Sequence, residues 1–426
     1  MGVARVSKQV SPDFRANYKR LPRWNAVAVQ ELAAGDPFPN LPGGTVLIDA
    51  LFGSGLSRPL SGYWARLIQY LNQLSIKRVA VDIPSGVFAD RPTAGPALHA
   101  QVTISFELPK LAFFFPENEA LIGEWEVVPI GLHTPSLADL STPYHLTDRE
   151  AARSLLRPRP RFSHKGTFGH ALLICGSYGM LGAALLSTRA CLRSGAGLVT
   201  THIPRCGYSI LQMSVPEAMA SVDRHEFQFS EVPELSRFSA IGIGCGLGQH
   251  PNTATALMTL LEQAKAPMVL DADALNILAQ HPDGLDVLPE GSILTPHPGE
   301  FRRLTREYGH HFDRLNRLQE LATAKKCIFM LKGAYTAVAT PDGNLYFNAT
   351  GNPGMATGGS GDVLTGLLTG LLAQGYPPST AARLGAYLHG LAGDLAAREL
   401  EHEALLASDI VSHIGRAFQY LKQIHA

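Results

Sequence analysis

The sequence carries no excess charge of either sign, because 36 Lys and Arg residues balance 36 Asp and Glu residues over 426 positions. A protein that binds nucleic acid usually has a surplus of basic residues on one face, and no Lys/Arg-rich run occurs here. The sequence also lacks any apolar run of 18 or more residues, the length that a transmembrane helix needs. We therefore expect neither a nucleic-acid partner nor a membrane partner.

Cysteine and metal-binding motifs are scarce as well. The five Cys residues form an odd set without a CxxC pair, which favours reduced, buried thiols in a cytoplasmic protein. The first residues contain no apolar stretch of the kind that a secretory signal needs. The 16 His residues include no HExxH motif, and the adjacent His310 and His311 would face different directions on a helix. We expect a cytoplasmic location and no dedicated transition-metal site.

What the sequence does contain is enough apolar material for a large core. Hydrophobic residues make up 46% and charged residues 17% of the chain, which excludes an intrinsically disordered chain. At about 150 residues per domain, the length predicts two or three domains. Residues 132–162 are polar and interrupted by prolines, and a boundary in this stretch divides the chain into residues 1–141 and 142–426.

Residues 1–141 show a strand and helix pattern. Apolar runs at residues 46–53 and 78–86 flank a helical pattern at 62–74, which predicts a βαβ unit. A further strand is predicted at 102–110. Short apolar runs that end in polar, Gly-containing turns are typical of buried parallel strands.

Residues 142–426 predict a large doubly wound α/β domain. Thr147 is the predicted N-cap of its first helix, and a β-hairpin with its turn at residues 341–343 is predicted within residues 331–348. Apolar segments that predict strands occur at residues 170–177, 197–204, 240–246, 267–273, 292–299 and 326–333.

The strongest functional signal is a glycine-rich segment at residues 351–362, which holds five Gly residues and leads into an apolar helical pattern. Glycine lets the backbone come close to a ligand, and free N–H groups at a helix N-terminus form an anion site. Asp362 would lie beside a bound phosphate. This position is unfavourable for a carboxylate unless the carboxylate accepts or donates a proton. The alternative is that Asp362 only caps the helix. The segment is not a Walker A loop, because GxxxxGK[ST] is absent.

Polar residues also follow several predicted strands, where open α/β sheets bind ligands. Lys332 could meet a nucleotide phosphate or be a solvated residue at a strand end. His297, between two prolines, could aim its imidazole at a ligand or be structural. Asp49 and Asp82 lie at adjacent strand ends and could bind a cation or a ribose hydroxyl, serve as acid or base, or only cap loops. The small residues around Ala183 favour either a planar ligand or close helix–sheet packing.

The second part of the chain resembles the bifunctional NAD(P)H-hydrate repair enzymes, in which an epimerase domain precedes an ADP- or ATP-dependent dehydratase domain. The resemblance covers residues 144–426 and implies a ribokinase-like doubly wound C-terminal domain preceded by an incomplete Rossmann-like α/β epimerase domain. It rests on these motifs, in the family's order: HKGTFGHALLICGS, RSGAGLV, GCGLG, LDADALN, TPHPGEF, LKGAYT, GNPGMATGGSGDVLTG and ALLASD.

The resemblance implies repair of NADH hydrate and NADPH hydrate with ADP or ATP as phosphoryl donor and Mg²⁺. Asp362 would deprotonate the hydroxyl group that attacks the phosphoryl group, and homo-oligomers are expected. The residues implied to bind the nucleotide are Lys332, Gly333, Ala334, Tyr335, Thr336, Gly358, Gly359 and Gly361. The residues implied to bind the hydrate are Ala183, Gly248, His297 and Asp362.

The first part matches the epimerase domain only in part. The resemblance implies that Asp49 and Ser85 hold potassium. The residues implied to touch the hydrate are Gly53, Ser54, Gly55, Leu56, Ser57, Arg58, Pro59 and Asp82. The family's first strand and its NNGGDG-type loop do not precede residue 1. We therefore expect an incomplete sheet with exposed apolar edges and impaired epimerase activity, unless the true start lies upstream.

Two other functions are compatible with the glycine-rich segment. A ribokinase-like kinase of a small molecule such as a vitamin precursor would share the segment and its Asp. A nucleotide-binding regulatory protein would need neither Asp362 nor the full set of glycines. The choice between ADP and ATP, and between NADH and NADPH hydrates, stays open at this level.

Overall fold

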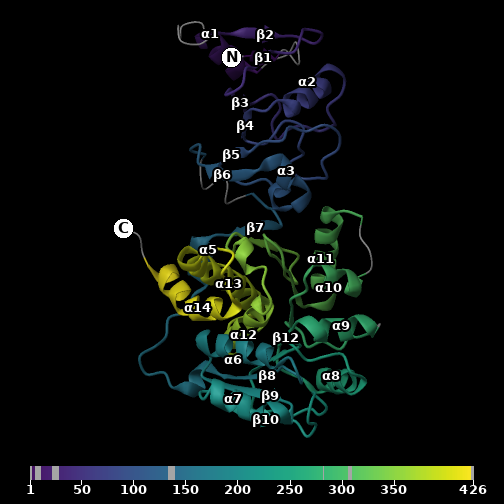
Figure 1. Cartoon of the computed structure of the whole chain (residues 1–426), viewed down its shortest axis with the longest axis vertical. Coiled ribbons are helices and arrows are strands. Elements are labelled where there is room, and N and C mark those ends of the chain that lie inside the picture. The colour runs from purple at the N-terminus through teal and green to yellow at the C-terminus, as the bar shows by residue number, and fades with distance from the viewer. Residues whose placement is uncertain are drawn as a thin grey trace. The chain divides into compact units, whose positions relative to one another are not determined.

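The computed structural model describes residues 2–4, 11–21, 28–132, 140–281, 283–305 and 309–423. The chain divides into two compact units, Met1–Ser141 and Thr142–Ala426 (Figure 1). Among the described residues, no helix has both the length and the apolar character that crossing a membrane requires. Each unit is described below by itself.

The first unit contains a four-stranded parallel sheet in the order β3-β4-β5-β6. Its strands are Val46–Asp49, Lys77–Val81, Val102–Phe106 and Glu124–Val128. Helix α2 (Gly62–Gln73) buries Tyr63, Leu67, Ile68 and Leu71, so the predicted βαβ unit β3-α2-β4 is confirmed. The remaining elements are β1 (Gly2–Ala4), which pairs in parallel with β2 (Gln30–Leu32), α1 (Pro12–Arg20), η2 (Leu111–Phe114), η3 (Pro116–Asn118) and α3 (Glu119–Ile122).

Strand β3 lies at the edge of its sheet and exposes apolar side chains. Val46 is 53% exposed and Ile48 is 67% exposed. On the same face of the sheet, Phe106 at the end of β5 is 38% exposed. Parallel sheets are usually covered on both faces. The exposed apolar side chains that the sequence predicts are therefore present on this sheet, whereas the activity of the unit stays a prediction.

The second unit is built on a ten-stranded sheet in the order β10-β9-β8-β11-β12-β13-β14-β15-β16-β7. Neighbouring strands are parallel except where β15 meets β14 and β16. The strands are β7 (Tyr144–Thr147), β8 (His170–Ile174), β9 (Leu198–Ile203), β10 (Met219–Val222), β11 (Ala240–Ile243), β12 (Met268–Leu270), β13 (Ile293–Leu294), β14 (Ile328–Leu331), β15 (Ala337–Ala339) and β16 (Leu345–Asn348).

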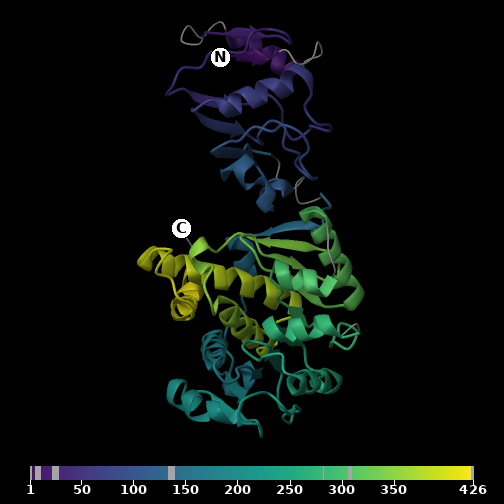
Figure 2. The same cartoon turned by 45° about the vertical axis from the view of Figure 1, so that its right-hand side comes forward.

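Helices flank this sheet in two groups (Figures 1 and 2). One group packs around the apolar helix α12 (Ser360–Ala373), in which every residue from Val363 to Ala373 is buried. Its other members are α6 (Leu181–Arg193), α13 (Pro378–Leu400) and α14 (Ala407–Lys422). The second group consists of α8 (Pro251–Gln263), α9 (Ala272–Gln280), α10 (Pro298–Thr305) and α11 (His311–Lys325). The shorter elements are α5 (Arg149–Leu155), η4 (Lys165–Phe168), η5 (Arg205–Gly207), α7 (Tyr208–Ser214) and η6 (Pro353–Met355).

The local predictions for this unit have two outcomes. The predicted hairpin is confirmed, because β15 and β16 pair in antiparallel fashion around residues 341–343. The prediction that Thr147 caps the first helix is wrong. Thr147 is the last residue of β7 and pairs with Asn348, and the side chain of Asp148 accepts the amide hydrogen of Ala151 and caps α5 instead.

Candidate functional site

The carboxyl ends of five parallel strands meet at one edge of the sheet. Strands β8, β11, β12, β13 and β14 are adjacent and parallel, so the residues that follow them lie along the same edge. Gly248, Asp271, His297 and Lys332 therefore come to one edge from segments that are far apart in the sequence. The N-terminus of α12 also lies here, because Thr365 in its first turns contacts Asp271.

The glycine-rich segment contains, at the N-cap of α12, a glycine that no other residue could replace without a shift of its neighbours. Gly359 is the N-cap of α12 and has φ = 93°, a backbone conformation that favours glycine. A Cβ atom on Gly359 would lie 2.6 Å from Leu186 Cδ1 and 3.0 Å from Ala407 Cβ. Asp362 is the third residue of the helix, and no side chain caps α12. The alternative that Asp362 is only a helix cap is therefore wrong.

Lys332 forms an ion pair at this edge. Its Nζ lies 2.6 Å from Oδ1 of Asp271, which is 1% exposed. Asp271 Oδ2 accepts a hydrogen bond from Thr365 Oγ1 at 3.0 Å. Burial lowers the pKa of Lys332, but the carboxylates of Asp271 and Glu300 outweigh burial, so the pKa is raised overall. Lys332 is a fixed cation rather than a solvated residue at a strand end.

The ion pair of Lys332 and Asp271 lies close to Gly361 in the first turn of α12. A Cβ atom on Gly361 would lie 3.3 Å from Oδ2 of Asp271 and 3.6 Å from Nζ of Lys332. The absence of a side chain leaves the first turn of the helix open to the ammonium group. Helix N-termini carry partial positive charge, so an anion at this position would meet both the helix N-terminus and the lysine.

The carboxyl group of Asp362 has an altered acidity. Burial raises its pKa to about 6. The thiol of Cys245 and the charge of Lys332 oppose this rise, whereas the carboxylates of Asp271 and Asp273 reinforce it. A carboxylate with a pKa near 6 is mostly ionised at pH 7 and still basic enough to accept a proton from a hydroxyl group during a reaction.

His389 on α13 contacts the start of α12. Its Nε2 lies 2.9 Å from the carbonyl oxygen of Ser360. Burial lowers the pKa of His389 to about 4, although the hydrogen bond to Ser360 opposes this change. Because a carbonyl oxygen only accepts, the neutral imidazole carries its proton on Nε2 and donates it to Ser360. This contact fixes the helix N-terminus that presents Asp362.

The residues implied to bind the hydrate surround the neighbouring strand ends. The amide of Gly248 donates to Oδ2 of Asp273 at 2.8 Å, and Ala183 lies against Gly246 in the same loop. The side chain of His297 is 49% exposed, and its Nε2 lies 3.5 Å from Oε1 of Glu300. The half-exposed imidazole is thus held at both ring nitrogens, because Nδ1 accepts a hydrogen bond from the amide of Gly299 at 3.0 Å and Nε2 faces Glu300.

Glu300 also connects the implied hydrate and nucleotide residues. Its Oε2 accepts the amide hydrogen of His297 at 2.8 Å and lies 3.9 Å from Nζ of Lys332. The other residues implied to bind the nucleotide after Lys332 form the turn between β14 and β15, where Gly333 and Ala334 are exposed and Thr336 Oγ1 donates to the carbonyl oxygen of Gly333 at 3.3 Å. Tyr335 lies in this turn, and Gly358 is exposed just before α12.

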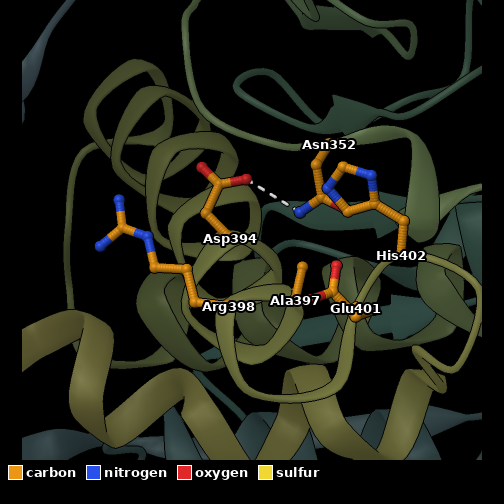
Figure 3. A pocket seen from close by; sticks show the side chains of 6 residues that line it. All are labelled: Asn352, Asp394, Ala397, Arg398, Glu401 and His402. Carbon is orange, nitrogen blue, oxygen red and sulfur yellow. Dashed lines mark hydrogen bonds between the residues drawn. The ribbon is translucent and has the colours of Figure 1, made fainter.

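A pocket of about 380 Å³ lies beside the beginning of the glycine-rich segment (Figure 3). Asp394 on α13 points toward the segment and accepts hydrogen bonds from the amide of Gly351 at 3.0 Å and from Nδ2 of Asn352 at 2.9 Å. The remaining lining residues are Ala397, Arg398, Glu401 and His402. The pocket marks where α13 holds the segment.

The first unit has a separate polar cluster at the ends of β3 and β4. Asp49 is 3% exposed and accepts hydrogen bonds from the amide and the hydroxyl group of Ser85, each at 2.7 Å. Burial raises the pKa of Asp49, although these hydrogen bonds and one from Leu51 oppose the rise. Asp82 points elsewhere: its Oδ1 lies 2.6 Å from Nζ of Lys110. The structure therefore brings Asp49 to Ser85, and it pairs Asp82 with Lys110.

The loop implied to touch the hydrate in the first unit, residues 53–59, is exposed except for half-buried Leu56. Leu56 accepts a weak hydrogen bond from Arg91 Nη2 through its carbonyl oxygen at 3.4 Å. No group of three or more His, Cys, Asp or Glu side chains suited to a metal ion occurs among the described parts of either unit.

Sequence reasoning singled out the segments that carry Asp271, Asp273 and Glu300 but gave these residues no role. Their signal was present, because Asp271 and Asp273 form the polar end of the predicted strand segment 267–273 and Glu300 directly follows the segment 292–299. Thr365 and His389 were missed altogether. Both lie inside helices, where a polar residue in an apolar pattern does not reveal which loop it contacts.

Two family models match the two parts of the chain. The family described as NAD(P)H-hydrate dehydratase matches residues 171–416, and the family described as YjeF-related protein N-terminus matches residues 3–112. A bifunctional NAD(P)H-hydrate repair enzyme Nnr of Moorella thermoacetica is 39% identical over 389 residues, which cover 89% of this chain and 73% of that protein. The enzyme of the same name from Escherichia coli is 35% identical over 375 residues, 87% of this chain and 71% of that protein.

Two solved structures resemble the second unit. An ADP/ATP-dependent NAD(P)H-hydrate dehydratase from Bacillus subtilis, co-crystallized with ATP/Mg²⁺, covers 65% of this chain and 99% of its own, with a TM-score of 0.58 and 33% identity. A ribokinase-like superfamily protein from Enterococcus faecalis covers 66% of this chain and 98% of its own, with a TM-score of 0.58 and 28% identity. The predicted ribokinase-like α/β fold is confirmed.

Proposed function

This chain belongs to the family of bifunctional NAD(P)H-hydrate repair enzymes, and on that premise we propose that its second unit dehydrates the hydrates of NADH and NADPH at Asp362, with ADP or ATP as phosphoryl donor. The observation that carries this proposal is the position of Asp362. It lies in the first turn of α12 with a pKa of about 6, beside the Asp271–Lys332 pair.

The reaction begins at the hydroxyl group that water addition leaves on the nicotinamide ring. Asp362 accepts the proton of this hydroxyl group, and the hydroxyl oxygen attacks the terminal phosphoryl group of the nucleotide. Phosphate then leaves with the electron pair of its bond to the ring carbon, and a proton leaves the neighbouring carbon. The ring double bond is restored, and the products are the reduced cofactor, phosphate and the shortened nucleotide.

The first turn of α12 stabilises the charge that moves during phosphoryl transfer. The amides around Gly359 and Gly361 face this charge at a helix N-terminus, and Lys332 adds a full positive charge next to Gly361. Because Lys332 is held by Asp271 at 2.6 Å, its ammonium group needs little reorganisation. Mg²⁺ bound to the nucleotide would neutralise phosphate charge, with Asp271 and Asp273 as the nearby carboxylates.

The hydrate lies between Asp362 and the loops that carry Ala183, Gly248 and His297. Glu300 holds His297 through its backbone amide, so the imidazole edge faces the ligand in a fixed direction. The exposed turn that contains Gly333 and Ala334 allows the nucleotide to approach the backbone closely. The dehydratase function is favoured over that of a vitamin-precursor kinase, because the relatives that match along most of this chain are NAD(P)H-hydrate repair enzymes.

In the first unit, Asp49 and Ser85 would hold potassium. The carboxylate of Asp49 is buried, and its raised pKa indicates that its hydrogen bonds do not fully offset burial. A monovalent cation with oxygen ligands fits such a site. The loop at residues 53–59 and Asp82 would face the hydrate. A cytoplasmic homo-oligomer is proposed for the whole chain.

The test combines the purified chain with NADH hydrate containing both epimers, Mg²⁺, and either ADP or ATP. Return of the absorbance of the reduced nicotinamide measures the reaction, and Asp362→Ala is the control. Recovery that needs a nucleotide and disappears in the variant supports the dehydratase and identifies its donor. A plateau near half of the input shows that the epimerase is inactive. No recovery with either nucleotide overturns the proposal.

A further inference from the structure

Two aromatic side chains meet on the surface of the second unit near the implied hydrate residues. Tyr178 is 71% exposed and Phe227 is 49% exposed. Their ring centroids lie 5.1 Å apart at an interplanar angle of 76°. Exposed apolar side chains scattered singly are ordinary, whereas two exposed aromatic side chains in contact offer a flat ligand more apolar surface than one alone.

The loops that carry this pair are held rigidly. The amide of Tyr178 donates to the carbonyl oxygen of Phe227 at 2.9 Å. Asp223, which is 1% exposed, accepts hydrogen bonds from the amide of His225 at 2.8 Å and from the amide and hydroxyl group of Ser230 at 2.7 and 2.6 Å. The buried carboxylate therefore fixes both ends of the turn that presents Phe227.

The pair also borders the site of the hydrate. Ser177, next to Tyr178 in the chain, donates through Oγ to the carbonyl oxygen of Gly246 at 2.8 Å. A Cβ atom on Gly248 would lie 3.9 Å from Ser177 Oγ. Gly248 is implied to contact the hydrate. Ser177 therefore lies between Tyr178 and the loop of Gly246 and Gly248, which is implied to face the reacting ring of the hydrate.

The surface beside Tyr178 is open. A Cβ atom on Gly179 or on Gly182 would meet no other atom within 4 Å. The side chain of Met180, between these glycines, is 43% exposed. A flat group that leaves the hydrate site past this segment would meet backbone without side-chain obstruction and then the face of an aromatic ring.

The proposed substrate has such a group. NADH hydrate and NADPH hydrate carry an adenine base joined to the reacting ring through two riboses and a pyrophosphate. We propose that Tyr178 and Phe227 form a stacking surface for this adenine, which would make them specificity residues for the dinucleotide. The proposal rests on the proposed dehydratase function. Base–aromatic stacking contributes enough binding free energy to change KM measurably.

The test compares two substrates that differ only in the adenosine monophosphate half of the dinucleotide. The hydrates of NADH and of reduced nicotinamide mononucleotide share the reacting ring, but the second lacks adenosine monophosphate. In Tyr178→Ala, we expect the KM for NADH hydrate to rise about tenfold, which corresponds to about 1.4 kcal/mol, and the KM for the mononucleotide hydrate to stay unchanged. Phe227→Ala should act in the same direction, and Tyr178→Phe should behave like the wild type.

Phe162→Ala is the matched control, because Phe162 is an aromatic residue that is 95% exposed in the segment between α5 and η4. An equal rise in KM for both substrates, or no rise for either, overturns the proposal. A change in oligomeric state of Tyr178→Ala, measured by light scattering, also overturns it, because the pair would then be a subunit contact.

A second measurement keeps this proposal separate from the proposed function. If the wild type turns over neither hydrate, the dehydratase proposal fails by itself. Binding of NAD⁺ and of nicotinamide mononucleotide, measured by calorimetry, then tests the stacking surface without turnover. Tighter binding of the dinucleotide that is lost in Tyr178→Ala supports the surface. A preference that persists unchanged in the variant, or no preference in the wild type, overturns it.

Discussion

The ammonium group of Lys332 lies 2.6 Å from the carboxylate of Asp271, and a Cβ atom on Gly361 would lie within 3.6 Å of both groups. The two charged residues follow β14 and β12, while Gly361 lies in the first turn of α12. One ion pair therefore joins the strand ends to the helix that carries Asp362. The pair fixes a cation beside the first turn of α12, and both of its charges influence the pKa of the proposed base, Asp362.

Asp362→Asn should abolish turnover and stabilise the protein. Loss of a general base reduces the rate by about 10² to 10⁴. The folded-state pKa of Asp362 is raised from 3.8 to about 6, so the folded state loses stability as pH rises through this range. At pH 8 the variant should gain on the order of 2 kcal/mol, seen as a Tm about 4 °C higher. At pH 5 the gain should be roughly half as large, because about half of the interval between the two pKa values has then been crossed. An equal or lower Tm at pH 8 would contradict the electrostatic assignment.

The pH dependence of kcat/KM should show a loss of activity in acid. Because Asp362 must be ionised to accept a proton, kcat/KM should fall about tenfold per pH unit below its pKa of about 6. A terminal phosphate also titrates near pH 6, so a variant is needed to assign the group. The carboxylate of Asp273 raises the pKa of Asp362, and Asp273→Asn should move the acid limb to lower pH. A limb that stays in place belongs to the nucleotide.

Lys332→Met should damage both stability and activity. The substitution leaves Asp271 buried without its cation, and breaking a buried pair typically costs about 3–5 kcal/mol. Thermal or denaturant unfolding measures this loss, and the KM for the nucleotide should rise. Lys326→Met is the matched control, because the side chain of Lys326 is 67% exposed and pairs with Glu290 at the surface. Its effect should stay within about 0.5 kcal/mol. Similar losses in both variants would argue against a special role for Lys332.

His389→Ala should lower kcat about tenfold or more by loosening the N-terminus of α12. The lost contact is the hydrogen bond from Nε2 to the carbonyl oxygen of Ser360 at 2.9 Å. Because the pKa of His389 is about 4, the imidazole is neutral from pH 5 to 8, and the shape of the pH profile should not change. His389→Gln keeps a donor and should recover part of the rate. A shifted profile would show that His389 itself exchanges a proton.

Potassium should stabilise the first unit through Asp49. We expect a higher Tm for this unit in KCl than in NaCl at equal ionic strength, because a cation offsets the buried carboxylate. Asp49→Ala should remove the difference. Asp36→Ala is the control, since Asp36 is an exposed residue that accepts a hydrogen bond from the amide of Ala33. Equal melting in both salts would exclude a potassium site at Asp49.

The sequence was sufficient to predict the strands that position the site, because parallel strands leave short apolar runs that end at polar turns. It also placed Lys332 at the end of a strand and Asp362 at the beginning of a helix, where the structure has them. The Asp271–Lys332 pair joins residues 61 positions apart, and no local pattern specifies that distance. The same holds for His389, whose partner Ser360 is set by how α13 packs on α12.

Capping was the least predictable feature. Thr147 and Asp148 are both good capping residues, and the choice between them depends on where β7 ends. Pairing of Thr147 with Asn348 extends the strand by one residue. A contact with a strand 200 residues later in the chain thus decides which neighbour begins the helix.

Helix α13 holds the glycine-rich segment at both of its ends, through Asp394 at Gly351 and through His389 at Ser360. The two anchoring positions on the helix are separated by about 7.5 Å along its axis, whereas ten residues of extended chain span about 33 Å. The segment is therefore a closed loop before any ligand arrives. The entropy of closing this loop is already lost in folding, so binding of a nucleotide does not have to supply it.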